Sequence, residues 1–274
     1  MRVLVTSTKD LASQTIKGIL VQEYGFEKTS EEFEGEPIYA LGDSIKIITA
    51  REDMIHCGHL EQTFSPEVFI FCSRHRSESK KPALLVHSTG NLGSDASFGG
   101  APHQLSVSAP PLVAAALKTL YRERNERNLD EFDVSLEVTH HGPTSMETPL
   151  VFIELGSSEE YWRHEEGARA VAAAIMESTT VPLTGEAVIG FGGTHYASKF
   201  NKLVLEKGYN IGHMAPKYAI NTLTLDLVKQ MITRSSCTVK TAILDWKGTN
   251  SENKAHLLPL LEEAGLEVVR NKDA

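Results

Sequence analysis

Residues 242–269, AILDWKGTNSENKAHLLPLLEEAGLEVV, contain two apolar runs of strand length separated by a helical pattern. The runs are Ala242–Leu244 and Leu266–Val269, and apolar residues recur at helical spacing between them, near Leu257–Ala264. Neighbouring parallel strands need a crossover connection, which is usually a helix. This stretch therefore predicts a β-α-β unit, the building block of α/β proteins.

The same alternation of strand and helix patterns runs through the rest of the chain. Helical spacing is found over Leu11–Val21, after Pro110-Pro111, and over Ser198–Lys207 before Gly208. Further apolar runs of strand length are Val3–Val5, Val68–Phe71, Ala83–Val86, Val134–Val138, Leu150–Leu155 and Ala187–Phe191. We therefore predict an α/β sandwich built on one mixed, largely parallel sheet.

Three local patterns add detail to this prediction. Ile38–Leu41 and Ile45–Ile48 flank a Gly-Asp-Ser turn, which predicts a hairpin and hence some antiparallel pairing. Ser157 followed by Glu160 fits a capping box, so we expect a long helix to begin there and to extend to about residue 176. Residues 23–36 are strongly acidic, and we expect a solvated loop there.

Composition excludes several classes of protein. The chain has 274 residues, of which 41% are hydrophobic and 23% are charged, as in ordinary globular proteins. No stretch reaches the ~18–20 apolar residues of a membrane span, and the first residues lack the pattern of a signal peptide. Three scattered cysteines argue against a disulfide framework. We expect one domain over residues 1–274, neither membrane-bound nor secreted, that works in the cytoplasm.

Four predicted strands run directly into turns that contain histidine. These turns are Ser73-Arg74-His75, His87-Ser88-Thr89-Gly90-Asn91, Thr139-His140-His141-Gly142-Pro143 and Gly192-Gly193-Thr194-His195-Tyr196. In open α/β sheets, ligands bind beyond the carboxyl ends of the strands. If the four strands are parallel and adjacent, we expect their histidines to converge on one cleft.

Two carboxylates, Glu137 and Glu154, lie inside predicted strands. A buried charge is costly unless it is paired or binds a cation. Zinc sites combine histidine nitrogen with carboxylate oxygen, and a catalytic site keeps one position for water. We therefore predict a metal centre whose ligands are His75, His140, His141 and His213. Two alternatives stay open: Glu154 orients a ligating histidine, or the histidines are ordinary core and surface residues.

Several motifs together resemble the zinc-dependent D-aminoacyl-tRNA deacylase family of archaea and plants. Besides the four histidine turns, the resemblance rests on Gly99-Gly100-Ala101-Pro102, Phe152-Ile153-Glu154-Leu155-Gly156-Ser157, Gly212-His213 and Pro216-Lys217-Tyr218. It extends over the whole chain, and the motifs are specific only as a set. The resemblance implies bound zinc and a three-layer α/β/α sandwich, similar to peptidyl-tRNA hydrolases and nucleoside phosphorylases.

The resemblance also implies a reaction, the hydrolysis of the ester that joins a D-amino acid to the terminal ribose of tRNA. Zinc lowers the pKa of its bound water to about 7 and polarises a carbonyl. We expect Glu154 to accept the proton of the water. We expect His195, or an N–H of the turn at Gly192 and Gly193, to stabilise the tetrahedral oxyanion.

The net charge of −9 is unfavourable for a tRNA-binding protein, because phosphates attract lysine and arginine. Two segments, residues 73–81 and 199–217, are nevertheless basic, each with four Lys or Arg residues against one glutamate. We expect them to form a basic rim in which Arg74, Lys199 and Lys217 bind tRNA, although two solvated surfaces would give the same pattern. No obligate protein partner is implied, so we expect a monomer.

Three other functions fit parts of the sequence. A metal-dependent hydrolase of a small ester or amide would use the same histidines and need no basic rim. A non-catalytic RNA-binding domain would have structural histidines and no metal. A nucleoside phosphorylase needs an anion site for phosphate, and the sequence holds no clear cluster for one.

Overall fold

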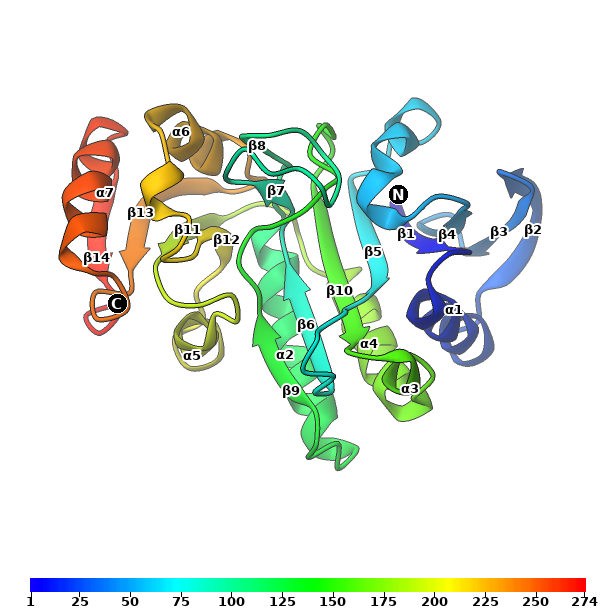
Figure 1. The fold of residues 1–274 in the computed structure, drawn as a ribbon. Coiled ribbons are helices and arrows are strands. Elements are labelled where there is room, and N and C mark those ends of the chain that lie inside the picture. The colour runs from blue at the N-terminus through cyan, green and yellow to red at the C-terminus, as the bar shows by residue number, and fades with distance from the viewer.

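The computed structural model describes residues 1–274 and contains two main β-sheets (Figure 1). The larger sheet has the strand order β2-β3-β4-β1-β5-β10-β6-β9. Its strands are β1 (Arg2–Ser7), β2 (Glu27–Phe33), β3 (Glu36–Leu41), β4 (Ile45–Ala50), β5 (Val68–Arg74), β6 (Ala83–His87), β9 (Asp133–Leu136) and β10 (Leu150–Gly156). The smaller sheet, with all strands parallel, has the order β12-β11-β13-β14. Its strands are β11 (Glu186–Phe191), β12 (Ile211–Ala215), β13 (Thr238–Leu244) and β14 (Glu267–Arg270), and β7 (Gly90–Asn91) pairs separately with β8 (Gln104–Leu105).

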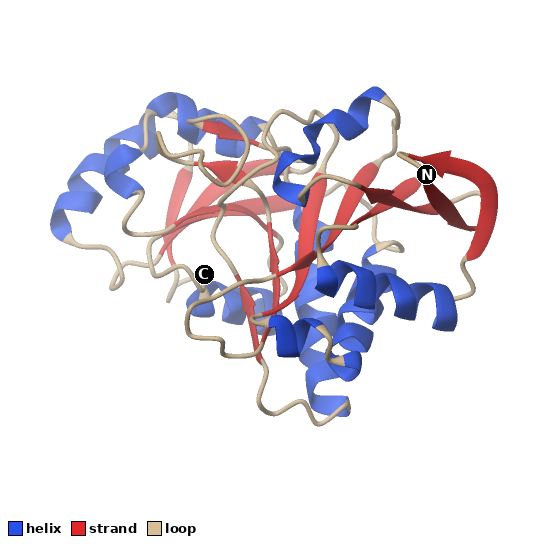
Figure 2. Ribbon diagram, turned by 45° about the vertical axis from the view of Figure 1, so that its right-hand side comes forward, coloured by secondary structure: helices blue, strands red, loops and turns tan.

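Helices cover both faces of the sheets (Figures 1 and 2). The largest apolar core lies under one face, where α1 (Leu11–Glu23), α2 (Pro110–Glu126), α4 (Glu165–Ser178) and α5 (Ser198–Lys207) pack. On the opposite side, the 3-10 helix η1 (Met54–Gln62) covers the larger sheet, and α6 (Leu225–Thr233) and α7 (Ser251–Glu263) cover the smaller one. Two short helices, α3 (Glu159–Trp162) and η2 (Ile220–Thr222), lie in connections. The predicted α/β fold with a mixed, mostly parallel sheet is confirmed.

None of the helices combines the length and the hydrophobicity that crossing a bilayer requires.

The arrangement of the strands differs from the expectation of one sheet with four adjacent parallel strands. β10 lies between β5 and β6, and β6 runs antiparallel to it. β11 belongs to the smaller sheet. The two sheets meet where the Val138 N–H donates to the His195 carbonyl at 3.1 Å and the Thr139 N–H donates to the Met214 carbonyl at 2.9 Å. We call this meeting of residues 137–139 with 195–196 and 214 the sheet junction.

Most local predictions hold. β3 and β4 form the expected hairpin, Pro110 opens α2, and α5 ends at Gly208 in the left-handed conformation. The acidic segment differs from the expected loop, because residues 27–33 form β2. This strand pairs with β3 at the edge of the sheet, where its charged side chains stay exposed.

The expected capping box is also wrong. The Ser157 hydroxyl donates to the Lys81 carbonyl at 2.6 Å, so it is engaged outside any helix. The long helix α4 begins later, where His164 Nδ1 accepts the Gly167 N–H at 3.0 Å and acts as the N-cap.

Candidate active site

Three neighbouring strands place one carboxylate between two histidines. Glu154 lies in β10, opposite Ser73 of β5 on one side and Leu85 of β6 on the other. His75 follows β5 and His87 ends β6, which approaches from the opposite direction. The Glu154 carboxylate therefore lies 3.4 Å from His75 Nδ1 and 3.6 Å from His87 Nε2. The convergence thus joins two parallel pairs, β5 with β10 and β6 with β9, across the antiparallel pairing of β10 with β6, and not four adjacent parallel strands as we expected.

The turn after β9 supplies two more histidines. His141 has a φ of 44°, in the left-handed region. The Gly90 N–H of β7 donates to the carbonyls of both residues of the turn, His141 at 2.8 Å and His140 at 3.2 Å. Gly90 has no space for a side chain, because a Cβ would collide with Leu105. A close approach between two backbones therefore fixes the turn.

Three imidazoles of the cluster share one hydrogen-bonding pattern. Nδ1 of His87, His140 and His141 lies 3.2, 2.8 and 2.6 Å from a backbone carbonyl oxygen, to which it donates. The ring centroids of His87 and His140 are 4.3 Å apart. A ring that is protonated at Nδ1 has its lone pair on Nε2, which is the arrangement that a backbone hydrogen bond imposes on a ligating histidine.

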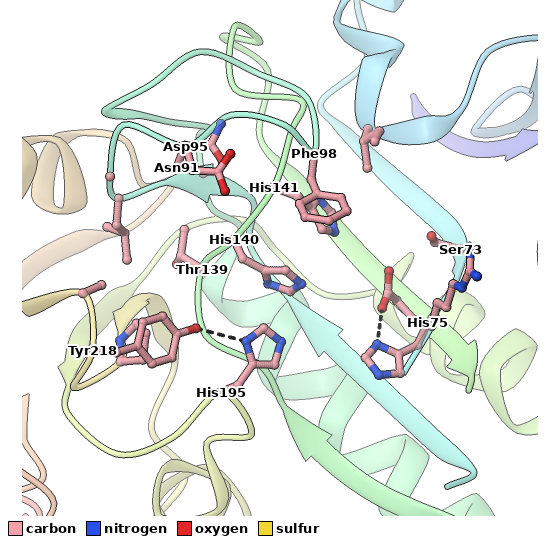
Figure 3. A pocket seen from close by; sticks show the side chains of 18 of the residues that line it. Ser73, His75, Asn91, Asp95, Phe98, Thr139, His140, His141, His195 and Tyr218 are labelled. Atoms are coloured by element: carbon pink, nitrogen blue, oxygen red, sulfur yellow. Dashed lines mark hydrogen bonds and ion pairs between the residues drawn. The ribbon is translucent and has the colours of Figure 1, made fainter. Parts of the chain in front are cut away.

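The sheet junction adds Glu137 and His195. Glu137 forms an isolated β-bridge with Tyr196, and its Oε1 lies 3.0 Å from His195 Nε2. On the other side of the ring, His195 Nδ1 lies 3.2 Å from the Tyr218 hydroxyl (Figure 3). The Tyr196 hydroxyl in turn lies 3.0 Å from His75 Nε2. Two tyrosines thus orient two histidines of the cluster.

The cluster lies at a cavity of about 750 Å³ (Figure 3). Five of its side chains line the cavity: His75, His140, His141, Glu154 and His195. The other two, His87 and Glu137, lie behind them with no exposed surface. Such a volume is typical of small-molecule sites in proteins.

Burial and mutual contacts set the charges of the cluster. Burial opposes ionisation of Glu154, but His75 and His87 outweigh this effect and hold the pKa of Glu154 well below its usual range. Burial likewise opposes protonation of His75, but the two nearby carboxylates prevail and raise its pKa. Burial, together with the neighbouring His87, lowers the pKa of His141 to about 4. The carboxylate is therefore ionised and the His141 ring neutral at pH 7.

Two buried atoms of the cluster, His87 Nε2 and Glu137 Oε2, have no hydrogen-bond partner. Leaving buried polar atoms unpaired is costly, so their presence indicates a missing partner. Three groups of ligand atoms lie within 4.8 Å of one another: His87, His140 and His141; Glu137, His140 and His195; and His75, Glu137 and Glu154. Imidazole nitrogen with carboxylate oxygen is a donor set that suits zinc. These residues therefore fit a metal ion.

His213 lies in a different environment. Its Nε2 lies 3.0 Å from the Ser106 carbonyl and 3.1 Å from the Arg234 carbonyl, and its Nδ1 lies 3.2 Å from the Thr139 hydroxyl. The Thr139 oxygen accepts the Met214 N–H, so its own hydrogen is available to His213 Nδ1. Both ring nitrogens are engaged with protein atoms. The structure does not bring His213 into any of the three groups of ligand atoms that hold the other histidines.

Two arginines line the cavity. Arg74 is held in place, because its guanidinium lies 2.7 Å from Asp53 Oδ2 and donates to the Lys9 carbonyl at 2.7 Å. Arg76 is exposed and takes part in no ion pair. Of the two, Arg76 is the one available to an incoming phosphate.

The remaining expected substrate-binding residues lie outside this cavity. Gly193, Lys199 and Lys217 line a second cavity of about 220 Å³. Lys199 Nζ is 2.7 and 2.9 Å from the two carboxylate oxygens of the buried Asp245. The Gly192 N–H, expected as an oxyanion donor, donates to the Ala215 carbonyl at 2.8 Å.

His87 and Glu137 were not among the ligands expected from the sequence, although both carried a signal. His87 ends a strand as the expected ligands do, and Glu137 stands between apolar residues. No sequence pattern indicated the tyrosine contacts, because Tyr196 and Tyr218 meet the cluster only through the folding of the smaller sheet.

Comparison with known proteins agrees with these features. A sequence model of the D-aminoacyl-tRNA deacylase family matches residues 62–269. The D-aminoacyl-tRNA deacylase of Thermococcus onnurineus is 36% identical, over 99% of this chain and 100% of its own length, and that of Pyrococcus horikoshii is 35% identical over the same shares. A crystal structure described as a conserved protein of unknown function has a TM-score of 0.89 and 32% identity, covering 99% of this chain and 95% of its own. The chain therefore belongs to the D-aminoacyl-tRNA deacylase family.

Proposed function

We propose that this protein hydrolyses the ester bond of D-aminoacyl-tRNA, releasing the free D-amino acid and tRNA. The observation that carries the proposal is the convergence of five histidines and two carboxylates at one cavity, in a chain about one-third identical to D-aminoacyl-tRNA deacylases over its full length. Acyl-ester hydrolysis needs an activated water, a base and a stabiliser for the oxyanion, and this cluster holds candidates for each.

We propose zinc as the cofactor, held by residues of the cluster, with His87, His140 and His141 offering Nε2 and Glu137 offering Oε2. When bound, zinc supplies a Lewis acid for the ester carbonyl and a lowered pKa for water. The backbone carbonyls that fix the three rings keep these nitrogens oriented without a metal.

Glu154 and His195 fill the two remaining roles. Glu154 is ionised and lines the cavity. Glu137 has no exposed surface and does not line it, so Glu154 is the carboxylate that can accept a proton from water. His195 also lines the cavity, and Glu137 and Tyr218 contact its two ring nitrogens. We propose that the His195 ring, oriented by these two contacts, lies against the developing oxyanion and stabilises it.

The tRNA approaches over the segment that contains Arg74 and Arg76. Arg76 is exposed and unpaired, so it can contact a phosphate close to the reacting ester, although the net charge of the chain is −9. All seven residues of the cluster belong to one chain, so we propose that the monomer is active. Its tRNA substrate is found in the cytoplasm, where we expect the enzyme to work.

The test is release of tyrosine from D-Tyr-tRNA and L-Tyr-tRNA, with and without a zinc chelator. We expect rapid discharge of the D form alone, abolished by the chelator and restored by zinc. Discharge that is unaffected by the chelator would support D-aminoacyl-tRNA as the substrate and contradict the proposal of a zinc cofactor. If neither tRNA is discharged but simple D-amino acid esters are, the protein is instead a hydrolase of small esters.

A further inference from the structure

The two most exposed aromatic rings of the molecule both line the active-site cavity. Phe98 is 68% exposed and Tyr218 is 64% exposed. The position of Tyr218 is explained by the hydrogen bond between its hydroxyl and His195. Phe98 has no polar group to explain its exposure, and placing a phenyl ring in water is unfavourable. Its position at the cavity therefore suggests a ligand that covers the ring.

The backbone around Phe98 is fixed. The Phe98 carbonyl accepts the Gly142 N–H at 3.0 Å, which ties the backbone of Phe98 to the turn that contains His140 and His141 (Figure 3). The Asn91 amide donates to the carbonyls of Gly99 and Ala101 at 2.8 and 3.2 Å. The backbone that carries the exposed ring is therefore held beside the turn of His140 and His141 and is not a free loop.

The two glycines after Phe98 show how closely this loop is packed. Gly99 and Gly100 have φ values of 82° and 75°, which disfavour any side chain. A Cβ at Gly99 would collide with the Ile55 carbonyl, and a Cβ at Gly100 would lie 2.5 Å from Thr144 Cγ2. The two glycines thus allow the loop to pack closely against Ile55 and Thr144, while Phe98 stays exposed.

We propose that Phe98 is the stacking platform for the terminal adenine of the aminoacyl-tRNA. This inference rests on the proposed function. The ester must reach the histidine cluster, and the tRNA body is too large to enter a cavity of about 750 Å³. The amino acid therefore points inward, and the adenosine, one ribose away from the ester, lies at the mouth. Phe98 is the exposed, unpartnered ring found there.

Stacking on an aromatic ring is a sequence-independent way to hold a single-stranded end. Each stacked base typically contributes about 1–3 kcal/mol, which corresponds to roughly 5- to 150-fold in binding. The 3′ end of every tRNA carries the same adenosine, so a platform without hydrogen-bonding groups suffices. The alternative is that the side chain of the amino acid stacks on Phe98. The two alternatives can be distinguished, because loss of the ring would then affect every ester of that amino acid and not only esters that contain adenosine.

The test compares two esters of the same amino acid, 3′-O-(D-tyrosyl)adenosine and D-tyrosine ethyl ester. In Phe98→Ala, we expect the ratio of kcat/KM for the adenosine ester to that for the ethyl ester to fall roughly 5- to 150-fold. Phe98→Tyr is expected to keep the ratio. Tyr121→Ala is the matched control, because Tyr121 is 48% exposed on α2 and does not line the cavity. An unchanged ratio in Phe98→Ala overturns the proposal, and equal loss on both esters assigns the ring to the amino acid instead.

A binding measurement keeps the inference separable from the proposed function. In tRNA with 2-aminopurine in place of the terminal adenine, stacking on Phe98 is expected to quench the fluorescence on binding, and Phe98→Ala is expected to abolish the quenching. If the wild type does not discharge D-Tyr-tRNA, the proposed function fails, and the fluorescence still decides whether the base lies on Phe98. Equal quenching by wild type and Phe98→Ala overturns the platform.

Discussion

Two fully buried histidines, His87 and His213, differ in what their ring nitrogens meet. His87 donates through Nδ1 to the Ser88 carbonyl, and its Nε2 makes no hydrogen bond and lies 3.6 Å from the Glu154 carboxylate. His213 has protein partners at both nitrogens. Because a metal ligand must offer a free lone pair, the hydrogen bonds of the ring, and not its burial, separate a ligand from a structural histidine.

This difference yields a paired prediction. His87→Gln removes a free Nε2, and we expect zinc affinity to fall at least tenfold. His213→Gln is the control at equal burial, and its zinc affinity is expected to stay within about twofold of wild type. The measurement is competition for zinc against a chromogenic chelator. Equal loss in both variants would show that burial alone explains the effect.

Glu154 is the residue to which the base role is assigned. In Glu154→Gln the side chain keeps its size but cannot accept the proton of water, so kcat for D-Tyr-tRNA is expected to fall about 10²- to 10⁴-fold. Zinc content, measured by mass spectrometry, is expected to stay at the wild-type level. Full activity with normal zinc content would remove Glu154 from the base role, and loss of zinc would make it a ligand.

At the scale of elements, the sequence predicted strand and helix positions better than strand directions. Apolar runs located β5, β6, β10 and β11, because burial of these strands shows in their composition. Nothing in those runs shows that β6 is antiparallel to β10 or that β11 belongs to a second sheet, because pairing depends on residues far away in the chain. The histidine-rich ends could be predicted to converge, but the reason for the convergence could not.

The loop between β7 and β8 allows a prediction at this scale. Gly99→Ala must adopt a φ of 82° and place a Cβ against the Ile55 carbonyl, so we expect a loss of about 2 kcal/mol or more in the free energy of unfolding. Gly93→Ala, in the same loop, meets nothing within 4 Å and is expected to change it by less than about 0.5 kcal/mol. Urea unfolding measures both. Similar values would contradict the close packing of the loop.

At the scale of the whole molecule, His213 of β12 connects segments distant in sequence through Ser106, Thr139 and Arg234. Burial lowers its pKa to about 4, against an ordinary value near 6.5 in the unfolded chain. The unfolded chain therefore binds more protons between these pH values. The free energy of unfolding is therefore unaffected by protonation of His213 above about pH 6.5. It falls as the pH drops toward 4, by about 3 kcal/mol in all.

The measurement is the free energy of unfolding in urea at pH 7 and at pH 4.5, for wild type and His213→Gln. Other titrating groups are common to both proteins, so the difference isolates His213. We expect the wild type to lose about 2–3 kcal/mol more than the variant on acidification. Equal losses would place the acid sensitivity in other residues.

The sheet junction has a consequence for the amount of folded protein. Glu137 links the end of β9 to His195, which follows β11, so the cluster takes residues from both sheets. With zinc on the ligands proposed above, the ion would tie Glu137, beside this junction, to the histidines that end β6 and follow β9, and its binding would add about 4 kcal/mol to stability when the free ion exceeds its dissociation constant a thousandfold. A shortage of that ion would then lower the stability of the protein as well as its activity. The amount of folded protein would therefore depend on the metal supply.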